Sequence, residues 1–151
     1  MNKLAREEIA KLLDITDPFL MIDQFEIIEQ GKQALATKIL GKDDWYFQSH
    51  LPKSQVMPAT LQIEGMLQTL VLLIYKSIEH GEHRAFINDI QVKLLAPVTP
   101  KSNIDYHATL LSTRRGITKG EVIGRSDAKM VCKGEFAYAS PHLMALPVKA
   151  R

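Results

Sequence analysis

The hydrophobic positions of this chain follow two periods, one typical of helices and one typical of strands. Residues 3–13 place leucine and isoleucine at helical spacing between charges, which predicts a short amphipathic helix. Residues 58–79 are apolar in nearly every direction around a helical axis, which is typical of a helix buried by its surroundings. Pro58 suits the first turn of this central helix, and His80 with Gly81 predicts its end.

The other patterned segments predict strands separated by turns. A buried helix beside long strands predicts a curved antiparallel sheet wrapped around that helix, which is an α+β domain. The turns are expected at Gln30-Gly31, at Arg115-Gly116 and at residues 126–129. The strands are expected at residues 25–28, 34–40, 85–95, 103–113, 116–124 and 130–139.

Length and composition fit one domain over residues 1–140, followed by a frayed tail at residues 141–151. The chain has 151 residues, of which 46% are hydrophobic and 24% are charged. Its net charge of +2 comes from scattered residues without a basic stripe, which argues against nucleic-acid binding. No apolar run is long enough to insert into a membrane, and the N-terminus lacks a secretory pattern, so we expect a cytoplasmic protein.

Two titratable residues stand out near the central helix. Glu64 has apolar neighbours in the helix, so desolvation is expected to raise its pKa and let it hold and donate a proton. Alternatively, Glu64 lies on one polar stripe that it shares with Gln68. His50 lies in residues 45–55, which are predicted to be irregular, and its imidazole is a competent base at neutral pH. A hydrogen-bonded loop histidine without chemistry is the alternative for His50.

The N-terminus of the central helix is a third candidate element. The N–H groups of residues 59–61 lack helical partners, and together with the helix dipole they can polarise a carbonyl or stabilise an enolate oxygen. A base, an acid and such a site suit proton abstraction beside a thioester carbonyl, with a β-hydroxyl leaving as water. The same groups also suit thioester hydrolysis.

The segment from His50 to Gln68 resembles the reactive segment of the FabZ-type 3-hydroxyacyl-acyl-carrier-protein dehydratases. That family carries His-Phe-Pro-Gly, two residues, Val-Met-Pro-Gly, then Leu-Gln-Ile-Glu-Ala and a later Gln. This chain has HLPK from His50, VMPA from Val56 and LQIEG from Leu61, with the same spacing. The segment PFLMID at residues 18–23 is similar to the family's Pro-Phe-Leu-Leu-Val-Asp.

The resemblance implies a hot-dog fold and a homodimer, often assembled further into a trimer of dimers. It implies that His50 of one subunit removes the C2 proton, while Glu64 of the other subunit protonates the leaving hydroxyl. A backbone N–H would bind the thioester oxygen, and an apolar tunnel would hold an acyl chain carried by acyl carrier protein or coenzyme A. The substrate-binding residues are then expected to be Leu51, Met57, Pro58, Ala59, Thr60 and Gln68.

The chain departs from the family pattern at Lys53 and Ala59, which replace glycines, and at Leu51, which replaces Phe. Glycine permits close backbone approach or positive φ, which Lys and Ala permit less readily. Three functions therefore stay open: a dehydratase of fatty acid or related biosynthesis, a hot-dog acyl thioesterase, and a non-catalytic acyl-thioester-binding subunit. Retention of His50 and Glu64 favours an enzyme.

Other polar or reactive groups are expected to have no chemical role. The sequence EHGEH at residues 79–83 predicts a solvated polar cluster rather than a metal site, and we expect neither a metal nor a cofactor. Cys132 is expected to be a buried, inert thiol. Met57, Met66 and Met130 are expected in the core.

Overall fold

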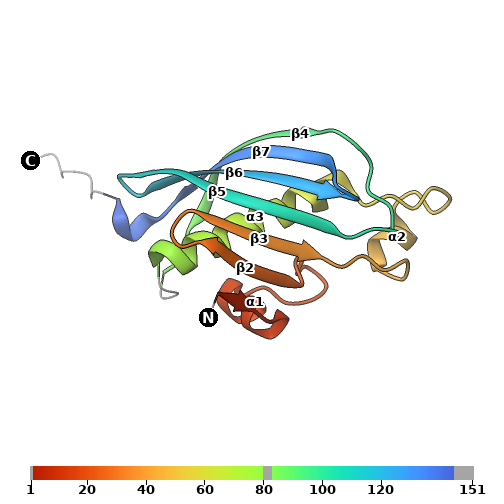
Figure 1. The fold of residues 1–151 in the computed structure, drawn as a ribbon, viewed down its shortest axis with the longest axis horizontal. Helices are drawn as coiled ribbons and strands as arrows, with labels where there is room; N and C mark the ends of the chain where they lie inside the picture. Colours follow the sequence, from red (N-terminus) through yellow and green to blue (C-terminus); the bar gives the residue numbers. More distant parts are fainter. Residues whose placement is uncertain (1, 80–82, 145–151) are drawn as a thin grey trace, which may run out of the picture.

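The computed structural model describes residues 2–79 and 83–144. In this part of the chain, a seven-stranded antiparallel sheet has the order β1-β2-β3-β5-β6-β7-β4 and lies against the long helix α3 (Figure 1). The strands are β1 (Lys3–Leu4), β2 (Gln24–Glu29), β3 (Gln33–Lys38), β4 (Phe86–Leu94), β5 (Ile104–Arg114), β6 (Ile117–Ser126) and β7 (Lys129–Ala139). The helices are α1 (Arg6–Leu13), α2 (Trp45–Ser49) and α3 (Ala59–Ile74), with the π-helical turn η1 (Tyr75–Glu79) and the 3-10 helix η2 (Pro141–Leu143).

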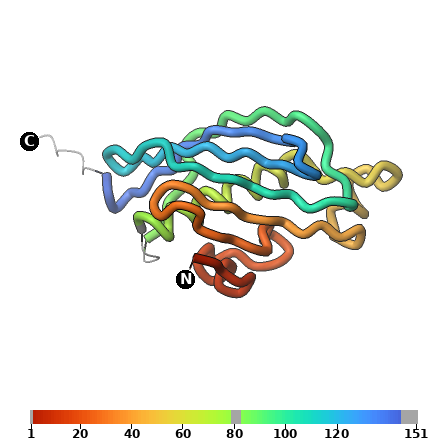
Figure 2. The backbone as a smooth tube through the Cα atoms, in the orientation of Figure 1, coloured from red at the N-terminus to blue at the C-terminus, as the bar shows by residue number. Residues whose placement is uncertain are grey.

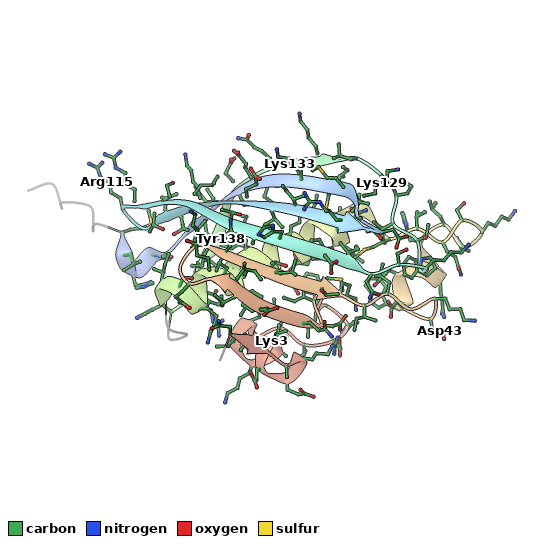
Figure 3. The ribbon with its side chains drawn as sticks, in the orientation of Figure 1. Lys3, Asp43, Arg115, Lys129, Lys133 and Tyr138 are labelled. Carbon is green, nitrogen blue, oxygen red and sulfur yellow. The ribbon has the colours of Figure 1, made fainter. Side chains whose placement is uncertain are left out.

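Alternating burial and tight turns build the sheet. Along β3 and much of β6, buried residues alternate with more exposed ones, because successive side chains of a strand point to opposite faces. The β5–β6 hairpin turns at Arg115 and Gly116, with φ of 52° and 78°, and Figure 3 shows Arg115 at its tip. Asp127 and Ala128 take φ of 51° and 62° in the β6–β7 turn. Two consecutive residues with positive φ match the right-handed twist of the paired strands, so the predicted hairpins are confirmed.

Helix α3 forms the centre of the core. It contacts β3, β4, β5, β6 and β7, and its side chains Met66, Leu70 and Leu72 are fully buried. Burying each such side chain stabilises the fold by about 1.5–3 kcal/mol. Close packing also constrains Gly65, where an added Cβ would lie 2.5 Å from Cζ of the buried Tyr106. The expectation of a central helix inside an antiparallel sheet is therefore confirmed, with η1 forming its last turn.

Four local expectations are wrong in part. The first helix begins at Arg6, because Lys3 and Leu4 pair with β2 instead of continuing the helix. The segment expected to be irregular contains α2, which burial of Tyr46 and Phe47 anchors, as tertiary packing does for short helices.

The end of the chain and one methionine also differ from expectation. The expected tail begins with the ordered helix η2, which the N–H of Leu143 closes by donating to the Ser140 carbonyl. Residues 145–151 of that tail lie outside the described residues. Met57 and Met66 are buried, whereas Met130 is only half-buried because it lies beside the exposed β6–β7 turn.

Strand β4 is an exposed, apolar edge of the sheet. Within the described residues it pairs only with β7, and Figure 2 shows it along the border opposite α1. Its side chains Phe86, Ile90 and Leu94 are 59%, 46% and 47% exposed. An exposed hydrophobic edge strand is a template for pairing with another strand. None of the described helices is long and apolar enough to cross a membrane.

Candidate functional site

His50 lies at the start of a protruding loop between α2 and α3. Its backbone N–H donates to the Tyr46 carbonyl at 2.9 Å, which ends α2. The N–H groups of Ser54 and Gln55 then both donate to the Leu51 carbonyl, at 2.9 Å and 2.7 Å. These bonds hold the loop in a tight turn, which Figure 2 shows projecting beyond the end of the sheet.

The ring of His50 has a defined tautomer. Its Nδ1 lies 2.9 Å from the carbonyl oxygen of Val56, across the loop. A carbonyl oxygen only accepts hydrogen bonds, so Nδ1 of the neutral ring must carry the proton. The lone pair is then on Nε2, which is the arrangement that a general base requires.

The two residues that replace family glycines do not strain the loop. Neither Lys53 nor Ala59 takes a positive φ; the residues of this loop that do are Leu51 at 54° and Gln55 at 48°. Ala59 is the first residue of α3, where any L-residue is accommodated. The conformational objection to carbonyl binding at these two positions is therefore removed.

We call the cavity beside His50 the His50 pocket. It has a volume of about 370 Å³ and lies where the start of α3 faces the end of β4. The N–H groups of Leu61 and Gln62 donate to the Pro58 carbonyl, while those of Ala59 and Thr60 have no hydrogen-bond partner within the described chain. These two groups are available to a ligand oxygen. The pocket is lined by His50, Val56, Met57, Ala59, Gln62, Leu94, Leu95, Ala96 and Pro97.

A second cavity, the Glu64 pocket, lies on the other side of α3. It has a volume of about 300 Å³ and a mostly apolar lining. Burial raises the pKa of Glu64, and a hydrogen bond from Gln68 lowers it by a smaller amount. A carboxyl group with a raised pKa keeps its proton to higher pH and can act as an acid. The pocket is lined by Leu13, Ile15, Glu64, Leu67, Gln68, Val71, Tyr75, Arg84, Ala85, Phe86, Ile87 and Tyr138.

Gln68 holds Glu64 in place. Its Nε2 donates to Oε1 of Glu64 at 3.0 Å and to the Phe19 carbonyl at 2.8 Å, and its Oε1 accepts from the Met21 N–H at 2.8 Å. Because Gln68 is only 1% exposed and uses both N–H donors inside the chain, it acts on Glu64 rather than presenting free donors to solvent. The sequence allowed two interpretations of Glu64: a desolvated carboxyl group, or a residue on a polar stripe shared with Gln68. In the structure both descriptions apply, because Glu64 is desolvated and also accepts a hydrogen bond from Gln68.

The segment contacted by Gln68 is anchored by charges. Asp23 accepts hydrogen bonds from Nε of Arg6 at 2.8 Å and from the Ile39 N–H at 2.7 Å, and Nζ of the buried Lys38 lies 3.3 Å away. Hydrogen bonding to Arg6 also lowers the pKa of Asp17. The segment at residues 18–23, which is similar to the family's Pro-Phe-Leu-Leu-Val-Asp, therefore supports Glu64 through Gln68 and lines neither pocket.

The structure divides the expected site residues between the two pockets. His50, Met57 and Ala59 line one, Glu64 and Gln68 line the other, and the two pockets share no residue. Leu51, Pro58 and Thr60 line neither pocket. Sequence reasoning missed Gln62, although it is a polar residue in the same apolar helix that drew attention to Glu64. It also missed Tyr138, whose hydroxyl donates to the Leu67 carbonyl at 2.9 Å and which Figure 3 labels on β7.

The remaining candidates stay outside both pockets. Cys132 is fully buried, and burial raises the pKa of its thiol to about 11, so it stays protonated at neutral pH as expected. In the predicted EHGEH cluster, residues 80–82 lie outside the described residues, and the ring of His83 stacks on that of His142 at 3.9 Å. Within the described ranges, no group of three potential metal ligands gathers.

A curved antiparallel sheet around a buried helix, with a histidine loop before that helix and a carboxyl group within it, defines a hot-dog-fold protein. The model of the FabA-like domain family matches residues 15–139, and the chain belongs to this family. It is 32% identical over 141 residues to the 3-hydroxyacyl-[acyl-carrier-protein] dehydratase FabZ of Salmonella arizonae, covering 91% of this chain and 93% of that relative.

Solved structures confirm the fold. The dehydratase heterocomplex ApeI:P from Xenorhabdus doucetiae has a TM-score of 0.70 at 14% identity, covering 88% of this chain and 90% of that chain. A mutant thioesterase from Pseudomonas aeruginosa has a TM-score of 0.70 at 12% identity, with coverage of 90% and 93%.

Proposed function

We propose that this protein dehydrates a 3-hydroxyacyl thioester to the trans-2-enoyl thioester. The substrate is carried by acyl carrier protein, and the reaction belongs to fatty acid biosynthesis in the cytoplasm. Membership of the FabA-like family and 32% identity to a FabZ dehydratase support this proposal. The geometry adds a base with a defined tautomer, an acid with a raised pKa, and free N–H groups at the start of a helix.

The observation that carries the proposal is the position of the two pockets at opposite ends of β4. The Glu64 pocket is lined by Phe86 and Ile87, and the His50 pocket by Leu94 and Leu95. Along a strand, Ile87 and Leu94 lie about 23 Å apart, at about 3.3 Å per residue. Each chain therefore carries two half-sites along one unpaired apolar edge.

A twofold axis through the middle of β4 would unite these half-sites. Antiparallel pairing of two β4 strands centred on Ile90 brings Phe86 of each protomer opposite the partner's Leu94, because the strands run in opposite directions. The His50 pocket of one protomer then adjoins the Glu64 pocket of the other. This homodimer would continue the sheet across the interface and cover the exposed side chains of β4.

The chemistry in such a combined site follows from its groups. Nε2 of His50 takes the C2 proton of the substrate, while an N–H of Ala59 or Thr60 stabilises the charge that develops on the thioester oxygen. The partner's Glu64 gives its proton to the 3-hydroxyl group, the C3–O bond breaks, and water leaves as the C2–C3 double bond forms. Transfer of a proton from His50 back to Glu64, directly or through water, restores both groups.

Mass spectrometry of the carrier-bound substrate tests the proposal. The protein is incubated with 3-hydroxybutyryl and 3-hydroxydecanoyl thioesters of acyl carrier protein. Loss of water from the acyl group supports dehydration, whereas loss of the whole acyl group would make the protein a thioesterase. An unchanged substrate would make it a binding subunit and contradict the proposal.

Variants assign the reaction to this site. His50→Ala and Glu64→Gln are each expected to abolish dehydration while leaving the dimer intact on size-exclusion chromatography. Glu7→Gln, at an exposed position of α1, is the matched control and should keep full activity. Activity that survives in both site variants would contradict the assigned roles.

A further inference from the structure

The carboxamide of Gln62 is an energetic anomaly in the core. The residue is 3% exposed, and its Oε1 is buried with no hydrogen-bond partner among the described residues. A buried acceptor that lost its water without gaining a donor destabilises the folded state. By contrast, Gln68 on the same helix satisfies its carboxamide fully.

Gln62 is one of the residues that line the His50 pocket. Gln62 and Glu64 are two residues apart on α3, so their side chains leave the helix about 200° apart. Gln62 accordingly lines the His50 pocket, while Glu64 lines the other one. Apart from His50, the side chains around Gln62 in this pocket are apolar, namely Val56, Met57, Ala59, Leu94, Leu95, Ala96 and Pro97.

We propose that Gln62 is a substrate-binding residue whose Oε1 accepts a hydrogen bond from the bound thioester. This inference rests on the proposed function. A carboxamide oxygen needs a donor, and a 3-hydroxyacyl thioester brings two kinds: the 3-hydroxyl group and the amide N–H groups of the pantetheine arm. Because His50 must reach C2, the atoms flanking the thioester enter the pocket that Gln62 lines.

Substitution by methionine separates this role from a structural one. Gln62→Met keeps a long unbranched side chain and removes the unpaired oxygen, so the melting temperature should stay the same or rise. Binding should weaken about tenfold, because one hydrogen bond to the ligand is lost. Gln62→Leu is the second variant, and Gln48→Met, at an exposed position of α2, is the matched control.

Calorimetric titration in a Glu64→Gln background measures binding without turnover. The probes are 3-hydroxybutyryl-pantetheine and butyryl-pantetheine, which lacks the 3-hydroxyl group. If the hydroxyl is the donor, Gln62→Met weakens binding of the first probe only. If a pantetheine N–H is the donor, binding of both probes weakens.

Two results would overturn the inference. Unchanged affinity for both probes in folded Gln62→Met shows that the ligand does not use this oxygen. A lower melting temperature for both Gln62→Met and Gln62→Leu shows that the carboxamide has a structural partner instead. Failure of the proposed function is distinguishable, because the protein with native Gln62 would then remove the whole acyl group or leave the carrier-bound substrate unchanged in the mass-spectrometric assay, whatever its affinity for the two probes.

Discussion

Mixing two inactive variants would test whether each active site takes His50 from one protomer and Glu64 from the other. In a dimer of one His50→Ala chain and one Glu64→Gln chain, one shared site lacks both groups and the second site keeps both. Random exchange of equal amounts places half of all chains in such mixed dimers. The mixture should therefore reach about one quarter of wild-type activity, since half the dimers hold one working site of two.

Steady-state dehydration, followed by the absorbance of the enoyl thioester, measures this recovery. Mixing Glu64→Gln with the double variant His50→Ala/Glu64→Gln is the matched control and should give no recovery. Native mass spectrometry with one tagged chain confirms that subunits have exchanged. No recovery in exchanged dimers would refute shared sites and place both groups in one chain.

In a second mixture, subunit exchange should lower the dehydration activity instead of restoring it. When wild-type chains exchange with the double variant, every shared site of a mixed dimer loses one group. Activity should fall from about one half to about one quarter of the wild-type value for the same total protein. Sites within single chains would keep the activity at one half, so the two arrangements predict different numbers in both mixtures.

Three further substitutions test the environment of the site. Burial raises the pKa of Glu64, so the folded protein holds this proton more tightly than the unfolded chain does. The protonated carboxyl therefore contributes to the stability of the folded state. This contribution is complete below the ordinary pKa of 4.5 and is lost as pH rises through the raised pKa. Glu64→Gln should therefore raise the melting temperature at pH 8 and leave it unchanged below pH 4, and a gain that is independent of pH would contradict this. Gln68→Met removes a hydrogen bond that lowers the pKa of Glu64, so the alkaline limb of the pH–rate profile should move to higher pH; an unmoved limb would exclude the positioning role. Gly65→Ala gains about 1 kcal/mol of helix propensity. The added Cβ would lie 2.5 Å from Cζ of Tyr106, so overpacking should cost about 2–3 kcal/mol, and calorimetry should show a net loss of about 1–2 kcal/mol. Its control, Gly41→Ala, meets only Oδ1 of Asp44 at 3.8 Å and should be tolerated.

The sequence predicted the fold where local pattern and tertiary packing agree. The apolar surface of α3 and the hairpin turn at Arg115-Gly116 carry their own signals, in periodicity and in turn chemistry. Lys3 and Leu4 do not, because their strand exists only through pairing with β2. Helix α2 likewise depends on the burial of Tyr46 and Phe47, which no local pattern reveals.

The sequence was enough to single out Glu64, but it did not reveal the hydrogen bonds that hold Glu64 in place. Glu64 could be found as a carboxylate in an apolar helix, and the raised direction of its pKa is confirmed. Gln62 is likewise a polar residue in an apolar helix, so the same pattern singles it out. The bonds from Gln68 to Phe19 and Met21 could not be predicted, since they join segments 47 and 49 residues apart through tertiary structure.

Among the polar side chains of α3, Gln68, Glu64 and Gln62 differ in how far the described chain satisfies them, and this order matches their proposed roles. Gln68 makes three hydrogen bonds within the chain and holds its neighbour. Glu64 has one such bond and stays poised to exchange a proton. The side-chain oxygen of Gln62 has no hydrogen-bond partner among the described residues. At position 62, where the carboxamide oxygen is buried and unpaired, an apolar residue would serve the core better. By keeping Gln62, the helix therefore gives up stability at a position where, as we propose, a ligand rather than the chain supplies the missing partner.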